Sequence, residues 1–293
     1  MLRYLIFFVS LTLVACASPA TRESAPRSES GAISIGTFNI RYANDGDGAN
    51  AWRHRKEMVV DILRDGDFWG LQEALPGQVE EIRAALPGYD IVVRSRERDP
   101  ARGEACPILY RRDRWELDSS DCGTFWLSET PEVAGSKSWD SSLPRIATFG
   151  RFVERASGRG LYVFNVHLDH QGKTARLEAA RLVAARIASR AHADPVVLLG
   201  DFNTGPQTPP IRVLLEDGQV VLRDVWRVAH PDAAEVSTFN GWAEVCRGDR
   251  IDYLFASPGL VVESCVVDGR KPGGRWPSDH VPVRAAFRFE PPG

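Results

Sequence analysis

The chain has 293 residues, enough for one large hydrophobic core or two small ones, and its content of 43% hydrophobic and 26% charged residues is ordinary for a globular protein. Its formal net charge is −3. Proteins that hold long nucleic acids usually carry a basic surplus, because neutralising phosphates drives that binding. The charge balance therefore disfavours a dedicated nucleic-acid-binding protein, while leaving room for a local basic patch.

The N-terminal segment is typical of an export signal. Residues 1–15 carry Arg3 followed by two apolar runs, which together are too short to span a bilayer comfortably as a mature helix. They lead into Leu-Val-Ala-Cys, which resembles the bacterial lipobox, where the cysteine (here Cys16) is lipidated and becomes the first mature residue. An ordinary cleaved signal with an incidental cysteine is the alternative. Residues 16–32 are small and polar, and we expect them to form a flexible tether.

Export sets expectations for localisation and for the other cysteines. Ala17, rather than aspartate, follows Cys16, which resembles the pattern for outer-membrane sorting, so we expect a periplasmic lipoprotein anchored in the outer membrane. An oxidising compartment permits disulfides. Three pairings are open, of which Cys106–Cys122 and Cys246–Cys265 are the most local in sequence. No CxxC spacing occurs, so a zinc–thiolate site is not expected.

Residues 33–290 alternate between short apolar runs and amphipathic stretches. Period-two alternation predicts a half-buried strand over 33–40, and apolar residues at helical spacing predict helices over 52–63, after Pro76, and over 173–190. Further strands are predicted at 68–72, 89–94, 106–110, 115–118, 122–127, 146–153, 161–167, 195–200, 250–256, 260–267 and 282–289. Many strands, few helices and no strict βαβ rhythm predict one α/β (α+β) domain over 33–290. We expect a four-layer αββα sandwich, with two mixed sheets packed face to face and helices outside.

Polar side chains stand at the ends of these apolar strands. Taken singly, each has a structural explanation: Asn39 or Asp201 could cap a turn, Glu73 could start a helix, and His167 could be a satisfied core histidine. The whole set is harder to explain in this way, and rigid strand ends are where sheet proteins build active sites. Its members are Asn39, Glu73, His167, Asp201, Asn203, Asp252, Asp279 and His280.

Four of these residues would form a buried acidic cluster if the strand ends converge. They are Glu73, Asp201, Asp252 and Asp279. Like charges held close together cannot all stay ionised without compensation, and a divalent cation is the simplest compensator. Carboxylate, amide and water oxygens favour a hard ion, so we expect Mg²⁺ or Mn²⁺ rather than zinc.

Six motifs then occur in a fixed order along the chain. They are TFNIR (37–41), LQE (71–73), NVHLD (165–169), GDFN (200–203), RIDY (250–253) and SDH (278–280). The set resembles that of the deoxyribonuclease-I-like, or endonuclease/exonuclease/phosphatase, superfamily and covers the chain from Ile33 to Phe289. The NIRY opening and the TFWLS segment also resemble a bacterial branch of that superfamily. The resemblance implies a metal-dependent hydrolase of phosphoric esters.

The resemblance also implies roles for the metal ligands and the catalytic base. Glu73 would bind the divalent metal, with Asn39 beside it and Asp279 completing the site through water. The metal would polarise the phosphoryl oxygen. Asp201 would orient and deprotonate the attacking water, and Asn203 would hold the phosphate.

The remaining roles concern the phosphate. His280, oriented by Asp252, would donate a hydrogen bond to the phosphoryl oxygens, and His167 would bind them from the other side. Glu104 would fix the tautomer of His167. We name Arg41 and Arg145 as candidate phosphate clamps.

Bond type is implied more firmly than substrate, because nucleases, sphingomyelinases, inositol-phosphate phosphatases and deadenylases share these motifs. We expect a monomeric general phosphodiesterase, with phosphomonoesters as further substrates, acting on nucleotides, nucleic-acid fragments or phospholipid headgroups. A dedicated extracytoplasmic nuclease is the first alternative. A catalytically silent binding lipoprotein of the same fold is the second, and the intact motif residues disfavour it.

Overall fold

The computed structural model describes residues 31–216 and 220–291. The predicted signal peptide (1–15), Cys16 and the tether as far as residue 30 lie outside the described residues. From Ala32 onward the described chain forms one structural unit. In the described ranges, no helix combines the length and the apolar character that a bilayer crossing requires.

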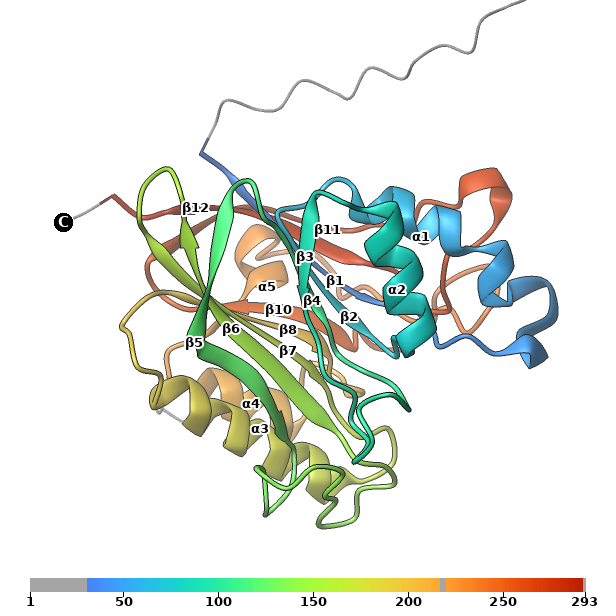
Figure 1. The fold of residues 1–293 in the computed structure, drawn as a ribbon, viewed down its shortest axis with the longest axis horizontal. Helices are drawn as coiled ribbons and strands as arrows, with labels where there is room; N and C mark the ends of the chain where they lie inside the picture. Colours follow the sequence, from blue (N-terminus) through green and yellow to red (C-terminus); the bar gives the residue numbers. More distant parts are fainter. Residues whose placement is uncertain (1–30, 217–219, 292–293) are drawn as a thin grey trace, which may run out of the picture. The chain divides into compact units, whose positions relative to one another are not determined.

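Two six-stranded mixed sheets make up the centre of this unit (Figure 1). Sheet 1 contains, in spatial order, β11 (Leu260–Val267), β12 (Val283–Phe289), β1 (Ile33–Asn39), β2 (Phe68–Gln72), β4 (Ile108–Arg111) and β3 (Tyr89–Val92). Sheet 2 contains β5 (Trp115–Trp126), β6 (Ile146–Glu154), β7 (Gly160–His167), β8 (Val196–Asp201), β10 (Asp252–Ala256) and β9 (Arg223–Asp224). Each sheet has one parallel pair, β1 with β2 and β7 with β8, among antiparallel neighbours.

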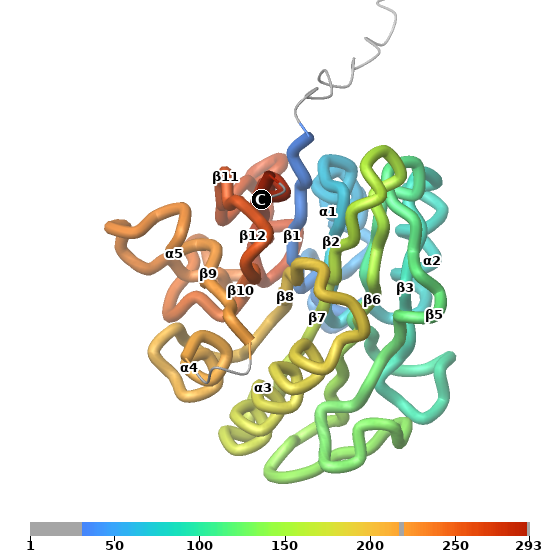
Figure 2. Tube along the Cα trace, turned by 90° about the vertical axis from the view of Figure 1, so that its left-hand side faces the viewer, coloured from blue at the N-terminus to red at the C-terminus, as the bar shows by residue number. Residues whose placement is uncertain are grey.

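Helices cover the outer faces of both sheets (Figures 1 and 2). α1 (Lys56–Leu63) and α2 (Pro76–Ala85) pack on sheet 1, whereas α3 (Lys173–Ala188) and α4 (Pro209–Glu216) pack on sheet 2. The short α5 (Val225–Ala229) lies against β10 and β11. Three 3₁₀ turns, η1 (Asp45–Asn50), η2 (Trp52–His54) and η3 (Pro272–Gly274), complete the described elements. The predicted αββα sandwich is confirmed.

Strand alternation distributes the apolar side chains among the layers. In β8, Val197 and Leu199 belong to the core between the sheets, whereas Val196 and Leu198 pack with the helices over sheet 2. The same period of two places Ile35 of β1 in the inter-sheet core. In these two strands, one row of alternate side chains therefore points to the inter-sheet space.

A buried polar network joins the two sheets where they approach closely. A Cβ atom on Gly70 would lie 2.1 Å from Leu199 and 2.8 Å from Asn165, so only glycine fits there. Gln72 donates from Nε2 to Oδ1 of Asn165 at 2.6 Å and to Oγ1 of Thr37 at 3.0 Å. Asn165 in turn donates to two main-chain carbonyl oxygens, each at 2.8 Å. Satisfied polar groups of this kind fix how the two layers pack.

A few predicted elements differ from the structure. The strands predicted at 115–118 and 122–127 form the single strand β5, whose pairing with β6 is irregular between Leu117 and Cys122. The helix predicted over 52–63 divides into η2 and α1. α4, α5 and the two-residue β9 are additional, because they are too short to show a clear period.

Neither of the most local disulfide pairings forms. All four of the described cysteines are free. Cys265 lies in the inter-sheet core, and Cys106 lies in a separate small cluster with Trp126 and Ile146. Burial raises the pKa of both thiols to about 12, so they remain protonated and unreactive at neutral pH.

Candidate active site

The inner rows of several strands end in polar side chains at one edge of the two sheets. Parallel pairing places Asn39, the last residue of β1, level with the residue before Glu73 at the end of β2. The second parallel pair places His167 opposite Asp201, and antiparallel pairing places Asp252 opposite Asp201 as well. The ends of β1, β2, β7 and β8 therefore meet the beginning of β10.

At the centre of this edge lies a buried cluster of Asp201, Asp252 and His280. Single ligand atoms from the three side chains all lie within 4.8 Å of one another. Nδ1 of His280 is 2.9 Å from Oδ2 of Asp252, and Nε2 is 3.8 Å from Oδ2 of Asp201. Burial alone would lower the pKa of His280, but the carboxylates of Asp252 and Asp201 outweigh it and raise the pKa to about 10. At neutral pH His280 is therefore an imidazolium, a donor on both nitrogens.

Asp201 has the surroundings of a proton acceptor. Its carboxylate is 1% exposed, and burial together with the nearby charge of Asp252 raises its pKa to about 7. Oδ2 accepts a hydrogen bond from Nδ2 of Asn39 at 3.0 Å, and Oδ1 accepts one from the main-chain N–H of Asn203 at 2.9 Å. A carboxylate whose pKa lies near the working pH is suited to general base catalysis.

Glu73 and Asp279 supply further carboxylate oxygens to the site. Glu73 has a left-handed backbone (φ 62°), a conformation that is uncommon outside functional sites. Its Oε1 accepts a hydrogen bond from Nδ2 of Asn39 and its Oε2 one from the main-chain N–H of Tyr42, both at 3.1 Å. Burial raises the pKa of Asp279, and the negative charge of Glu73 raises it further against the opposing effects of His280 and Arg41.

The side-chain oxygens of these residues and of Asn39 fit a divalent cation. The carboxylates of Glu73 and Asp279 and the carboxamide of Asn39 are oxygen ligands of the kind that hard cations select. At Asp279 the charge of Glu73 is opposed by His280 and by Arg41, whose Nε lies 3.9 Å from Oδ2 of Asp279. A bound cation would act in the same direction as these two positive charges.

The second histidine differs from the first in charge. Nε2 of His167 lies 3.4 Å from Oδ2 of Asp201. Burial lowers the pKa of His167 well below its ordinary value, and the positive charges of Arg145 and Arg96 lower it further. Asp201 is therefore flanked by a neutral imidazole and an imidazolium, so the contact with His167 is a polar contact and not an ion pair.

The predicted phosphate-binding residues lie around this centre with protein partners of their own. Arg41 donates to Asp47 through Nε and Nη2, each at 3.0 Å. Arg145 is 3.4 Å from Asp169, and its Nη2 is 2.9 Å from Nδ1 of His170. Asn203 donates from Nδ2 to a main-chain carbonyl oxygen at 3.0 Å and has a left-handed backbone (φ 51°).

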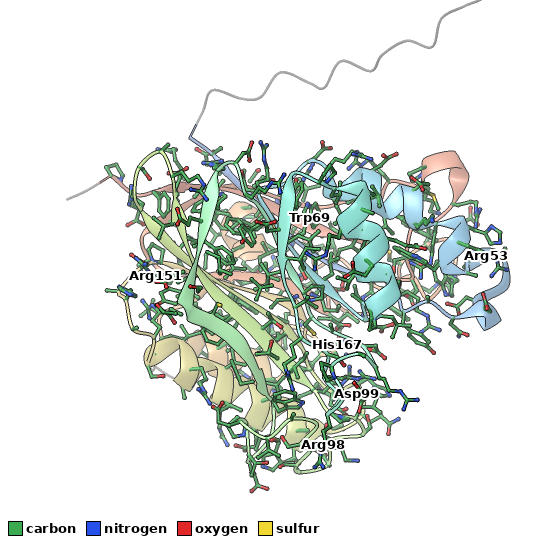
Figure 3. All side chains as sticks on the ribbon, in the orientation of Figure 1. Arg53, Trp69, Arg98, Asp99, Arg151 and His167 are labelled. Atoms are coloured by element: carbon green, nitrogen blue, oxygen red, sulfur yellow. The ribbon has the colours of Figure 1, made fainter. Side chains whose placement is uncertain are left out.

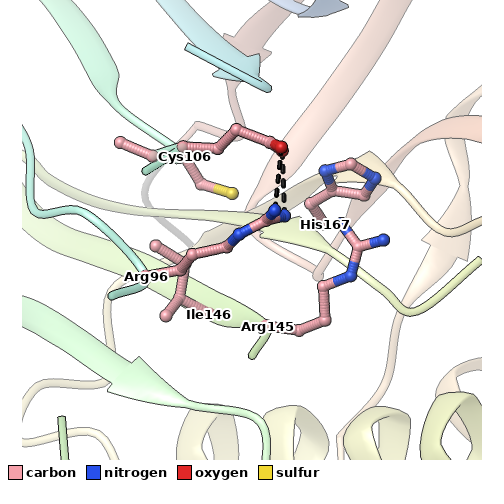
Figure 4. Close-up of a pocket in the computed structure, with 7 residues that line it drawn as sticks. Arg96, Cys106, Arg145, Ile146 and His167 are labelled. Atoms are coloured by element: carbon pink, nitrogen blue, oxygen red, sulfur yellow. Dashed lines mark hydrogen bonds and ion pairs between the residues drawn. The ribbon is translucent and has the colours of Figure 1, made fainter. Parts of the chain in front are cut away.

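Glu104 has Arg96 as its partner in place of His167. Its two carboxylate oxygens accept hydrogen bonds from Nη1 and Nη2 of Arg96, at 2.9 and 2.8 Å (Figure 4). Both side chains line a small pocket together with His167. Arg96 could not be predicted from the sequence, because it is one of four arginines between residues 94 and 104 and no spacing distinguishes it.

Comparison with known protein families gives a match that spans most of the chain. Residues 36–280 match the Endonuclease/Exonuclease/phosphatase family. The chain belongs to the endonuclease/exonuclease/phosphatase family. It is accordingly a hydrolase that acts on phosphoric ester bonds.

Proteins similar to this phosphoesterase are found both among solved structures and among sequence relatives. A family member from Bacteroides vulgatus is 33% identical with a TM-score of 0.81, covering 88% of this chain and 99% of that one. A mannosyl-6-phosphatase of Bacteroides thetaiotaomicron is also 33% identical, with a TM-score of 0.80, covering 88% of this chain and 100% of that one. The protein L388 of Acanthamoeba polyphaga mimivirus is 28% identical over 163 residues. That match covers 52% of this chain and spans less than two thirds of the mimivirus protein, 59% of its length.

The phosphoesterase should be active between two pKa values. Asp201 must lose its proton to act as a base, so activity should fall as the pH drops below about 7. His280 must keep its proton to act as a donor, so activity should fall again as the pH rises above about 10. Because the pKa of His280 is raised above its ordinary 6.5, its ionisation stabilises the fold fully below about pH 6.5, and this stabilisation is lost as the pH rises through about 10.

A profile of kcat/KM against pH, with thermal unfolding measured at each pH, tests these expectations. An acidic limb near 3.8, the ordinary pKa of aspartate, would contradict the role of burial and of Asp252 at Asp201.

Proposed function

We propose that the chain is a metal-dependent phosphodiesterase in which Asp201 activates the attacking water. One observation carries the proposal: Oδ2 of Asp201 lies close to Asn39 and to both histidines of the site. It accepts a hydrogen bond from Asn39 at 3.0 Å and lies 3.4 Å from Nε2 of His167 and 3.8 Å from Nε2 of His280. A water bound to this oxygen would be next to the groups that bind the phosphate.

The cation, Mg²⁺ or Mn²⁺, would be held by Glu73, with Asn39 and Asp279 as further ligands. When bound, it would polarise the phosphoryl oxygen and balance developing negative charge. The cluster of Asp201, Asp252 and His280 is the other candidate for the cation. A cation bound there would have to displace a proton from His280, because an imidazolium has no free lone pair for a metal.

The side chains divide the remaining work. Oδ1 of Asp201 is held by the N–H of Asn203, which leaves Oδ2 to take a proton from water. As the water oxygen bonds to phosphorus, the ester P–O bond breaks, and the alkoxide leaves with the electron pair of that bond and takes a proton from solvent. The imidazolium of His280, oriented by Asp252, and the neutral His167 donate hydrogen bonds to the phosphoryl oxygens, where negative charge grows.

A phosphomonoesterase acting on sugar phosphates is the second candidate. The observation that favours it is the mannosyl-6-phosphatase of Bacteroides thetaiotaomicron, which is 33% identical and aligned over its whole length. A dedicated nuclease ranks lower, since the net charge of −3 offers no basic surplus for long nucleic acids.

The proposal extends to the location of the enzyme. Residues 1–15 would be a signal peptide, and Cys16 would carry the lipid that anchors a catalytic domain (33–290) through the tether 16–32. Two or more acyl chains make such anchoring stable. We propose a monomeric, periplasmic enzyme at the outer membrane, acting on nucleotides, nucleic-acid fragments or phospholipid headgroups.

Hydrolysis of bis-p-nitrophenyl phosphate and p-nitrophenyl phosphate by the purified protein tests the proposed function. We expect cleavage with Mg²⁺ or Mn²⁺ and none with EDTA, and a faster rate on the diester than on the monoester. A faster rate on the monoester would favour the second candidate. Absence of turnover with every metal would overturn the proposal.

A further inference from the structure

A small pocket beside His167 is lined by charged side chains that the proposed chemistry does not use. Arg96 and Arg145 are 8% and 4% exposed, and Glu104 lines the pocket with them. Figure 4 shows Arg145 extending toward His167, with Arg96 on another side of the pocket. Burying charged groups costs free energy even when they are paired, so their presence at this place calls for an explanation.

The hydrogen bonds of these side chains are incomplete. Nε of Arg96 is buried without a hydrogen-bond partner, and the nearest carboxylate recorded for it, on Glu97, is 3.8 Å away. A buried donor left unsatisfied typically costs about 1–3 kcal/mol. Each carboxylate oxygen of Glu104 accepts one hydrogen bond from Arg96 and has a further lone pair. The cluster therefore has both donor and acceptor capacity for a ligand.

We infer that Arg96, Glu104 and Arg145 form a subsite for the hydroxyl groups of a sugar or polyol phosphate. This inference rests on the proposed ester hydrolysis, and among the candidates above it favours the enzyme that acts on sugar phosphates. A hydroxyl group both donates and accepts, so neighbouring hydroxyls match a guanidinium beside a carboxylate. Since the pocket adjoins His167, a substrate whose phosphate lies on His167 has its hydroxylated group beside this pair.

Other substituents fit the pocket less well. A nucleobase is usually held by a large aromatic face, and no Phe, Tyr or Trp is among the described residues that line the pocket. An acyl chain would desolvate the charged groups without hydrogen-bonding to them. A second, larger cavity between α2 and the segment 93–105 shares Ala105 with this pocket.

The test compares a hexose 6-phosphate with p-nitrophenyl phosphate, which has no hydroxyl groups to bind. We expect the wild-type protein with Mg²⁺ to prefer the hexose 6-phosphate in kcat/KM. Arg96→Met and Glu104→Gln should each lower the ratio of the two kcat/KM values by about 10-fold or more, mainly through the KM for the sugar phosphate. The ratio is internal to each preparation, so partial loss of folded protein does not change it.

Arg98→Met is the matched control, because Arg98 is exposed on the same segment, which lies beside His167 in Figure 3. Its ratio should equal that of the wild type. A wild-type enzyme that hydrolyses p-nitrophenyl phosphate but shows the same ratio as both pocket variants would overturn the subsite and leave the phosphoesterase function standing. A wild-type protein that cleaves bis-p-nitrophenyl phosphate but neither monoester would also overturn the subsite and leave the phosphodiesterase function standing. Absence of turnover on all three esters with every metal would overturn the function itself.

Discussion

Replacing Asp201 by asparagine should lower kcat by about 10²–10⁴-fold, the range that general base catalysis contributes. Asparagine has nearly the same shape but cannot take a proton from water. Its single amide oxygen can accept the hydrogen bond from Asn39 or the one from the main-chain N–H of Asn203, so one of the two is lost. Stability should change little, because a second effect offsets this loss. The raised pKa of Asp201 means that its ionisation opposes folding above its ordinary pKa of 3.8, and asparagine removes this effect.

Steady-state kinetics and thermal unfolding measure the two halves of this prediction. Asp232→Asn is a suitable control, because Asp232 is exposed and lies outside the site. A loss of less than about 10-fold in kcat would contradict the assignment of Asp201 as the base.

Replacing Glu73 by glutamine should abolish most metal-dependent activity, with a loss of at least about 100-fold at a metal concentration that saturates the wild type. A neutral carboxamide removes the charge that makes Glu73 a strong ligand. The hydrogen bonds that Glu73 accepts from Asn39 and Tyr42 can be kept only in part. The affinity for Mn²⁺, measured by calorimetric titration, should fall together with activity.

Glu80→Gln on α2 is the control for this variant, since the side chain of Glu80 is 71% exposed. Unchanged Mn²⁺ affinity in Glu73→Gln would show that the cation binds elsewhere. A loss of affinity in Asp252→Asn would then assign it to the cluster of Asp201, Asp252 and His280.

Strand periodicity explains why the centre of the site could be predicted from sequence. The inner row of β8 runs through Val197 and Leu199 to Asp201, so a carboxylate appears where the alternation calls for another core residue. His167 at the end of β7 follows the same rule. The two sheets pack face to face, so the ends of their inner rows lie near one another. The alternation of apolar and polar residues therefore bears on both the sandwich and the position of its polar strand ends.

The contacts around the centre of the site could not be predicted, because no local sequence pattern encodes them. Residues 93–107, between β3 and β4, have no strand or helix period, so the pairing of Glu104 with Arg96 appears only in the structure. Arg145 likewise pairs with Asp169 across a loop. The free cysteines follow from tertiary placement. Cys106 and Cys265 are buried in two different clusters, whereas Cys122 and Cys246, their nearest partners in sequence, are only partly buried.

The two hydrogen bonds that the carboxamide of Asn39 donates limit which substitutions this enzyme can accept during evolution. One nitrogen, Nδ2, donates both to Glu73, which follows a strand of sheet 1, and to Asp201, which ends a strand of sheet 2. The proposed metal ligand and the proposed base would therefore stay aligned only while the two sheets keep their separation. A core substitution that spreads the sheets slightly, even far from the site, should impair turnover before it unfolds the protein. Selection for catalysis would then restrict the volume of the inter-sheet core more tightly than selection for stability does.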